Sequence, residues 1–235
     1  MGNSWFQFQK FRINQDRTAM KISTDAVLLG ALAEVKDPLQ ILDIGTGTGV
    51  IALMLAQRYP EARILGIELD HDAAKQAREN AGASVFSERV AILQMPIQSF
   101  NTSLKFDLIV SNPPYFPDHL KSTDQKRNQA LHTDQLSFGE LLEKVEELLD
   151  QQGSFWVILP PRQMQDFIKL AEKKRLFPNV VNQVRDSEGK KIQREIVGFT
   201  FEHALSIQKE ILIKDESGEA HESYRALVSG FLLNF

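Results

Sequence analysis

The chain has 235 residues, of which 43% are hydrophobic and 25% charged, a composition typical of a globular protein with one buried core. It has no cysteine, which excludes disulfides and thiolate metal sites, and we expect no metal. It has neither a membrane-length apolar run nor a signal peptide, so we expect a cytoplasmic protein without a membrane partner. The net charge of -4 argues against nucleic-acid binding over the whole surface and leaves only local basic patches.

From residue 40 onward, short apolar runs rich in β-formers alternate with segments of helical periodicity. This alternation is typical of a parallel sheet covered by helices. The expected strands are 41–44, 64–69, 90–93, 106–110 and 155–159, and the expected helices are 50–59, 72–81, 141–149 and a segment after Pro161 that runs through Met164, Phe167 and Ala171.

The last strands of the predicted sheet follow a different pattern. Strands are expected at 180–184 and 196–201, and the polar turn 186–191 between them is too short for a helical crossover. These two strands should therefore form an antiparallel hairpin. A further strand at 211–213 and an amphipathic segment at 224–233 close the chain. The predicted fold is a single Rossmann-like α/β domain with a mostly parallel seven-stranded sheet, an antiparallel late hairpin, and helices on both faces.

A glycine-rich loop follows the first predicted strand. That strand ends on Asp43, and the loop contains Gly45, Gly47 and Gly49. Glycine lets the backbone turn tightly and approach a ligand, while the free N–H groups of a helix start favour an anionic group. The Gly-x-Gly-x-Gly spacing after an acid differs from the pattern of dinucleotide binders and favours S-adenosylmethionine, whose only anion is a carboxylate. The alternative is a tight strand-to-helix turn without a ligand.

Glu68 lies at the end of the second predicted strand. At that position, about 20 residues after the glycine loop, a carboxylate can accept hydrogen bonds from both ribose hydroxyls of a nucleoside cofactor. Asp70 lies two residues further on and is an alternative, either as the true ribose partner or as a helix cap.

The motif that selects the reaction is Asn112-Pro113-Pro114-Tyr115, at the end of the fourth predicted strand. Prolines lack N–H groups and hold the backbone extended, so the carbonyls here are left free to accept hydrogen bonds. An exocyclic amine on adenine is a poor nucleophile because its lone pair is conjugated into the ring. If the Asn112 side-chain oxygen and the Pro113 carbonyl accept its two N–H hydrogens, they favour the positive charge that develops on nitrogen during methyl transfer.

Tyr115 offers a ring face on which the target base can stack, a contact worth roughly 1–3 kcal/mol. This chemistry needs neither a metal nor a strong base. The alternative for the motif is a proline-stiffened strand end with a surface tyrosine.

These residues resemble class I methyltransferases that modify planar amino groups, and within them the tRNA1(Val) adenine-37 N6-methyltransferases. The resemblance runs from about Phe8 to the C-terminus, and its most specific stretch beyond the two motifs is Asp-Arg-Thr-Ala-Met-Lys-Ile-Ser-Thr-Asp-Ala-Val-Leu-Leu-Gly at 16–30. It implies an S-adenosylmethionine-dependent enzyme that methylates N6 of an adenine in tRNA, with tRNA as substrate and no obligate protein partner. It also implies a class I methyltransferase domain at 40–235.

The same resemblance implies that segment 1–39 covers the cofactor and brings Lys21, Thr24 and Asp25 to it. The alternative is that Ser23, Thr24 or Asp25 caps a helix and that Lys21 is solvated. The chain departs from the family pattern after the third strand, where Pro96 replaces an acid that would bind the cofactor adenine. Adenine should then be bound by backbone groups or Gln94, with Met95 as an apolar wall.

Three other functions compete with this interpretation. An N5-glutamine methyltransferase of peptide release factors uses the same Asn-Pro-Pro-Tyr motif, but such enzymes carry a longer segment before the first strand. A ribosomal guanine-N2 methyltransferase commonly has Phe in place of Tyr115. A non-catalytic adaptor would be favoured by loss of Asn112 or the glycines, and both are present.

Because the net charge is negative, RNA docking should depend on local basic clusters. The alternative for each cluster is an ordinary solvated face. The candidates are Lys10, Arg12 and Arg17 before the core, Lys121, Lys126 and Arg127 after Tyr115, and Lys190, Lys191 and Arg194 in the late hairpin.

Overall fold

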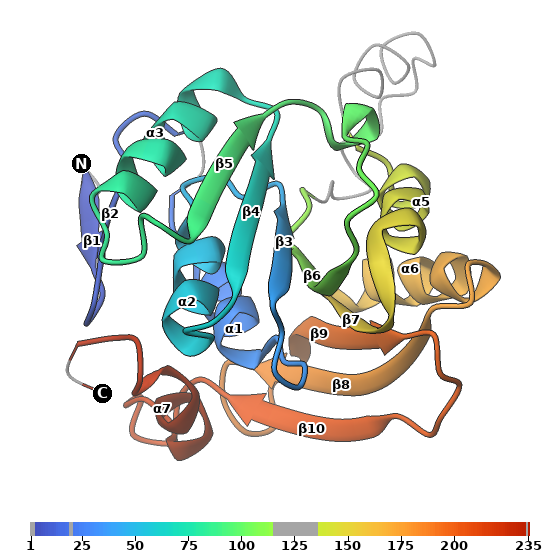
Figure 1. Ribbon diagram of the computed structural model, residues 1–235. Helices are drawn as coiled ribbons and strands as arrows, with labels where there is room; N and C mark the ends of the chain where they lie inside the picture. Colours follow the sequence, from blue (N-terminus) through green and yellow to red (C-terminus); the bar gives the residue numbers. More distant parts are fainter. Residues whose placement is uncertain (1–2, 19–20, 115–135, 234) are drawn as a thin grey trace, which may run out of the picture.

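The computed structural model describes residues 3–18, 21–114, 136–233 and 235, and its centre is one eight-stranded sheet (Figure 1). The strand order is β10-β8-β9-β7-β6-β3-β4-β5. The strands are β3 (Gln40–Ile44), β4 (Arg63–Glu68), β5 (Val90–Gln94), β6 (Phe106–Ser111), β7 (Leu149–Leu159), β8 (Phe177–Arg185), β9 (Ile192–Thr200) and β10 (Ile207–Leu212).

The pairing confirms the mostly parallel sheet with a late hairpin. Strands β3 to β7 pair in parallel, whereas β9 is antiparallel to both β7 and β8. The expected number of seven strands was wrong, because β10 pairs in parallel with β8 and extends the sheet to eight. Four of the six β10 residues are exposed, so the apolar signal in the sequence was confined to the end of this edge strand.

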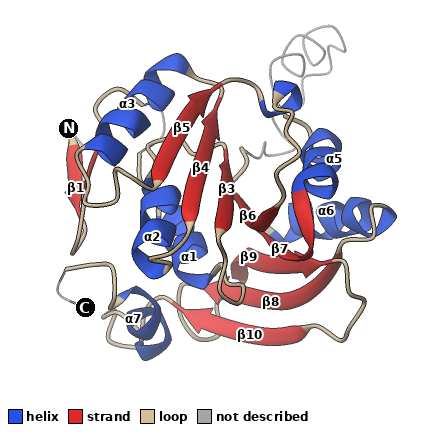
Figure 2. Cartoon of the chain, viewed as in Figure 1, coloured by secondary structure: helices blue, strands red, loops and turns tan. Residues whose placement is uncertain are grey.

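Helices cover both faces of the sheet, as predicted (Figure 2). In β3, Ile41 packs with α1, α2 and α3, whereas Leu42 and Ile44 pack with α5 and α6 on the other face. No helix in the described part of the chain is long and apolar enough to cross a membrane. The helices are α1 (Thr24–Leu32), α2 (Val50–Arg58), α3 (His71–Gly82), η1 (Ile97–Ser99), α5 (Phe138–Leu148), α6 (Pro161–Lys173) and α7 (Glu222–Val228).

The segment before the core forms a hairpin of β1 (Trp5–Gln7) and β2 (Arg12–Asn14), which the sequence analysis did not predict. Asn80 of α3 attaches the end of this hairpin to the core. Its Oδ1 accepts from the Asn14 N–H, and its Nδ2 donates to the carbonyls of Asn14 and Thr48, all at 2.9 Å. Because Thr48 belongs to the glycine loop, one buried amide connects α3 to both the N-terminal segment and that loop.

We expect Asn80→Ala to lower the free energy of unfolding by about 2–3 kcal/mol, because it leaves a backbone N–H and two carbonyls without their partner. Urea unfolding followed by circular dichroism measures the loss. Asn101→Ala is the matched control, since that exposed amide donates to a single carbonyl among the described residues, that of Ser99. Equal losses in the two variants would contradict the role of Asn80.

Candidate active site

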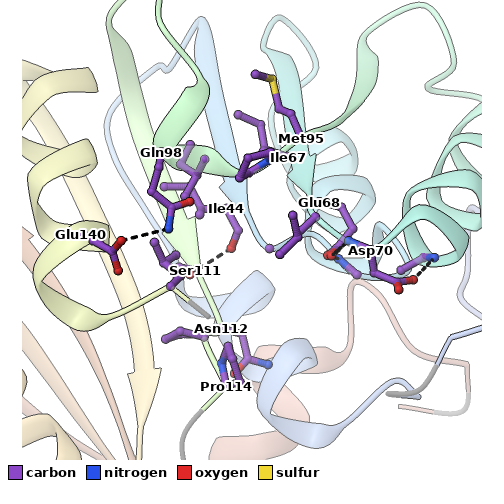
Figure 3. A pocket seen from close by; sticks show the side chains of 18 of the residues that line it. Ile44, Ile67, Glu68, Asp70, Met95, Gln98, Ser111, Asn112, Pro114 and Glu140 are labelled. Carbon is purple, nitrogen blue, oxygen red and sulfur yellow. Dashed lines mark hydrogen bonds between the residues drawn. The ribbon is translucent and has the colours of Figure 1, made fainter. Parts of the chain in front are cut away.

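A cavity of about 890 Å³ opens at the carboxyl ends of β3, β4 and β6 (Figure 3). Ligands of open α/β sheets bind in this position, and the volume is in the range of small-molecule sites. The cavity brings together most of the predicted site residues. Its lining comprises Thr18, Ile44, Gly45, Gly47, Ile67, Glu68, Leu69, Asp70, Ala73, Met95, Pro96, Ile97, Gln98, Ser111, Asn112, Pro113, Pro114, Leu136 and Glu140.

The three glycines of the loop have left-handed backbone conformations, which allow the tight turn that the sequence predicted. Gly45, Gly47 and Gly49 have φ angles of 75°, 56° and 82°. A Cβ atom on Gly45 or Gly47 would meet no atom within 4 Å, so both residues leave open space for a ligand. Gly49 instead caps α2 and lies against Ala77 of α3, 3.5 Å from where its Cβ would be. Gly49 therefore shapes the loop and does not line the cavity.

Glu68 connects the end of β4 to the glycine loop. Its Oε2 accepts from the Gly47 N–H and its Oε1 from the Asp70 N–H, both at 2.9 Å. Each carboxylate oxygen keeps a second lone pair for a ligand hydroxyl. Asp70 caps α3 by accepting from the Ala73 N–H at 2.8 Å, which confirms the cap interpretation for that residue.

Asp43 lies beneath the loop and not in the cavity. The side chain is fully buried, and the Thr46 hydroxyl donates to its Oδ2 at 2.6 Å. Its Oδ1 has no regular hydrogen bond in the described part of the chain, although the Ala52 N–H faces the carboxylate closely enough to influence its titration. Burial raises the pKa of Asp43 to about 7, Glu68 adds to the rise, and Thr46 and Ala52 oppose it. Asp43 thus supports the loop from below.

This shift predicts a pH dependence of stability. Between about pH 4 and pH 7 the folded state holds a proton on Asp43 that the unfolded state has released, so stability is complete below this window and falls as pH rises through it. The Asp43→Asn side chain cannot ionise, so this variant does not lose stability in this way. As the pH rises through the window, the free energy of unfolding of wild type should therefore fall by about 2–4 kcal/mol relative to that of the variant.

Urea unfolding of wild type and Asp43→Asn at pH 4.5 to 7.5 tests this pH dependence of stability. Asp166→Asn, which changes an exposed carboxylate, is the control. Parallel pH profiles for wild type and Asp43→Asn would show that Asp43 does not titrate in this way.

The Asn-Pro-Pro segment lies beside the glycine loop because β6 pairs with β3. The Ser111 hydroxyl donates to the Ile44 carbonyl at 2.9 Å and attaches the two strand ends to each other. Asn112 is half-buried and Pro113 buried, and both line the cavity. The Asn112 side chain makes no hydrogen bond to any residue that the structure describes, so its amide is available to a ligand. Tyr115 lies outside the described residues.

The residues that the family resemblance brought to the cofactor, Lys21, Thr24 and Asp25, do not line the cavity. Lys21 is exposed and lies 3.5 Å from the Asn3 carbonyl, and Thr24 is the exposed first residue of α1. Ser23 caps this helix by accepting from the Ala26 N–H at 3.2 Å. From the N-terminal segment the cavity is lined by Thr18, which the sequence analysis did not single out.

Some side chains of the predicted basic clusters form ion pairs with acidic residues, and others are exposed. Arg17 pairs with Glu79, and Arg194 pairs with Asp25 at 2.6 Å. Lys10 is exposed. The cluster that follows Tyr115 in the sequence lies outside the described residues; its members are Lys121, Lys126 and Arg127.

Gln98 and Glu140 line the cavity and were also missed by the sequence analysis. Gln98 belongs to η1, and Glu140 lies in the first turn of α5, where it forms a capping box with Ser137. The Ser-x-x-Glu spacing marks the helix start in the sequence but does not show that the helix begins at a cavity. Met95 lines the cavity as predicted, whereas Gln94 does not.

Comparison with known proteins decides the family. The model of the methyltransferase small domain matches residues 22–186. The tRNA1(Val) (adenine(37)-N6)-methyltransferase of Pedobacter heparinus is 41% identical over 230 residues, covering 98% of each chain. That of Pseudoalteromonas translucida is 39% identical over 230 residues, covering 98% of this chain and 99% of the relative. This chain belongs to the tRNA1(Val) (adenine(37)-N6)-methyltransferase family.

Solved structures support the fold of this family. A predicted O-methyltransferase from Agrobacterium tumefaciens superposes with a TM-score of 0.68 at 19% identity, covering 90% of this chain and all of the other. A ribosomal protein L11 methylase from Lactobacillus delbrueckii subsp. bulgaricus superposes with a TM-score of 0.58 at 16% identity, covering 81% and 84%. At these identities the likeness concerns the class I methyltransferase fold.

The cavity fits S-adenosylmethionine, the cofactor of this family. Gly45 and Gly47 leave their Cβ space open to a ligand, Glu68 retains acceptor capacity, and Met95 and Ile97 offer an apolar surface to a base. No group of three or more His, Asp or Glu side chains in the described ranges is arranged to hold a metal ion.

Proposed function

We propose that this protein transfers a methyl group from S-adenosylmethionine to N6 of an adenine in tRNA, and that the adenine is position 37 of tRNA1(Val), as the names of its relatives state. The observation that carries the proposal is the position of Asn112 and Pro113 in the same cavity as the glycine loop and Glu68. The relatives' names favour tRNA adenine over release-factor glutamine and ribosomal guanine.

Asn112, Pro113 and Tyr115 are the residues proposed to act on the target base. The Asn112 side-chain oxygen and the Pro113 carbonyl accept the two N6 hydrogens and direct the nitrogen lone pair at the methyl group. A new C–N bond forms as the C–S bond breaks, and the nitrogen then releases one proton to water. Acceptors fixed in advance stabilise the developing positive charge more than the neutral amine. Tyr115 supplies the stacking surface.

Gly45, Gly47 and Glu68 are the residues proposed to hold the cofactor directly. When bound, S-adenosylmethionine supplies a methyl group activated by a sulfonium. The glycine loop receives the carboxylate end at the start of α2, and Glu68 accepts hydrogen bonds from the ribose. Asp43 and Gly49 act indirectly, because they shape the loop that holds the cofactor. Met95 borders the base, while Lys21 and Thr24 lie outside the cavity and are given no role.

The proposed reaction is tested by mass spectrometry of nucleosides from tRNA1(Val) transcripts incubated with enzyme and labelled S-adenosylmethionine. We expect N6-methyladenosine at position 37 with the wild type. Asn112→Ala should lower turnover by about 100-fold or more, the loss expected for one preorganised transition-state hydrogen bond, with nearly unchanged affinity for S-adenosylmethionine.

A tRNA carrying guanine at position 37 is the control substrate and should stay unmethylated. Label in another base or atom, or near wild-type turnover by Asn112→Ala, would contradict the proposed reaction.

A further inference from the structure

One wall of the cavity carries two polar side chains that the proposed reaction does not use. Gln98 of η1 and Glu140 of α5 come from different elements and meet at the cavity (Figure 3). The Gln98 Nε2 donates to the Glu140 Oε1 at 3.3 Å, a long hydrogen bond that a better partner can replace.

The two oxygens of Glu140 have different tasks. Oε2 accepts from the N–H and the hydroxyl of Ser137, at 2.8 and 2.6 Å, and this capping box fixes the carboxylate. Oε1 accepts only from Gln98 in the described part of the chain. The Ser137 hydroxyl is the main cause of a lowered pKa, so Glu140 stays ionised and can only accept hydrogen bonds.

Apolar side chains line the same cavity as this pair. Met95, Pro96, Ile97 and Leu136 line the cavity, and none of their side chains offers a strong hydrogen-bonding group. The other acids of the cavity accept from backbone N–H groups: Glu68 from Gly47 of the glycine loop and from Asp70, and Asp70 from Ala73 at the start of α3. In the view of Figure 3 these two acids lie across the cavity from Gln98 and Glu140.

We infer that Glu140 and Gln98 read the edge of a 6-aminopurine. Glu140 Oε1 accepts from the exocyclic amine, and the Gln98 amide donates to a neighbouring ring nitrogen. A 6-oxopurine would place a carbonyl oxygen against the Glu140 carboxylate and be rejected. This inference rests on the proposed function and assigns the adenine recognition that Pro96 cannot provide.

The base that is read belongs to the cofactor and not to the RNA. Gln98 belongs to the lining segment that follows the end of β5, and β5 pairs with β4, whose last residue is Glu68, the proposed ribose partner. The target base has its own acceptors in Asn112 and Pro113. Glu140 and Gln98 are therefore binding and specificity residues for the cofactor.

The test compares binding of S-adenosylhomocysteine and S-inosylhomocysteine by isothermal titration calorimetry. In the second ligand a carbonyl oxygen replaces the 6-amino group and N1 carries a hydrogen, so the partners of both Glu140 and Gln98 change from donor to acceptor or the reverse. Wild type should prefer the adenine ligand by about 10-fold to 100-fold, the range for one charge-assisted hydrogen bond. Glu140→Gln retains a residue suited to the capping box but presents either a donor or an acceptor, so the preference should fall below about 3-fold. Gln98→Ala should also reduce the preference for the adenine ligand.

Two control variants test whether a loss of the preference for the adenine ligand is specific to Glu140 and Gln98. Glu143→Gln removes the same charge from the exposed face of the same helix, at a residue that does not line the cavity, so the preference should remain. Asp70→Asn should leave the preference unchanged.

An unchanged preference in both Glu140→Gln and Gln98→Ala overturns the inference while leaving the proposed function intact. A raised KM for tRNA with an unchanged preference would assign the pair to the target base and also overturn it. If wild type binds neither ligand, the proposed function itself fails.

Discussion

The parallel pairing of β3 with β6 is the constraint on which the site depends. Ile44 lies opposite Ser111 in the register, so the chain leaves both strands at the same level of the sheet. One strand continues into the glycine loop and the other into Asn112, which places the proposed cofactor and base sites side by side. The hydrogen bond from the Ser111 hydroxyl to the Ile44 carbonyl holds the two ends in this position.

Buried polar groups then fix the loop that leaves β3. Asp43 supports it from below through Thr46, Glu68 binds the Gly47 N–H from the side, and Asn80 holds the Thr48 carbonyl. Groups of this kind cost free energy when they are buried, and they stabilise only in the geometry that satisfies them. The loop is therefore shaped in advance by side chains on three elements, which limits the ordering that cofactor binding still requires.

The sequence was informative where a short stretch determines its own structure. The glycine loop, the Asn-Pro-Pro strand end and the late hairpin each have local chemistry that permits few conformations. The parallel sheet followed from the alternation of apolar runs. The position of Asp43 beneath the loop, outside the cavity lining, could not be predicted from the sequence, because burial of a carboxylate depends on the elements packed around it.

Features that arise from contacts between distant segments were missed for the same reason. The hairpin of β1 and β2 is attached to the core by Asn80, 66 residues from Asn14. The strand expected at 211–213 is present as β10, but its start at Ile207 and its pairing with β8 were not predicted, because four of its six residues are exposed. Glu140 was not singled out from the sequence, because only the fold places its Oε1 3.3 Å from the Gln98 Nε2 at a cavity. Lys21 and Thr24 were predicted from resemblance alone, and they do not line the cavity.

A crystal structure of the protein with S-adenosylhomocysteine tests the central claim, that the β3–β6 pairing joins a cofactor site to a base site. We predict that the sulfur lies between the glycine loop and Asn112 and that both ribose hydroxyls donate to Glu68. A ligand bound elsewhere, or in this cavity with its sulfur turned away from Asn112, would contradict the account.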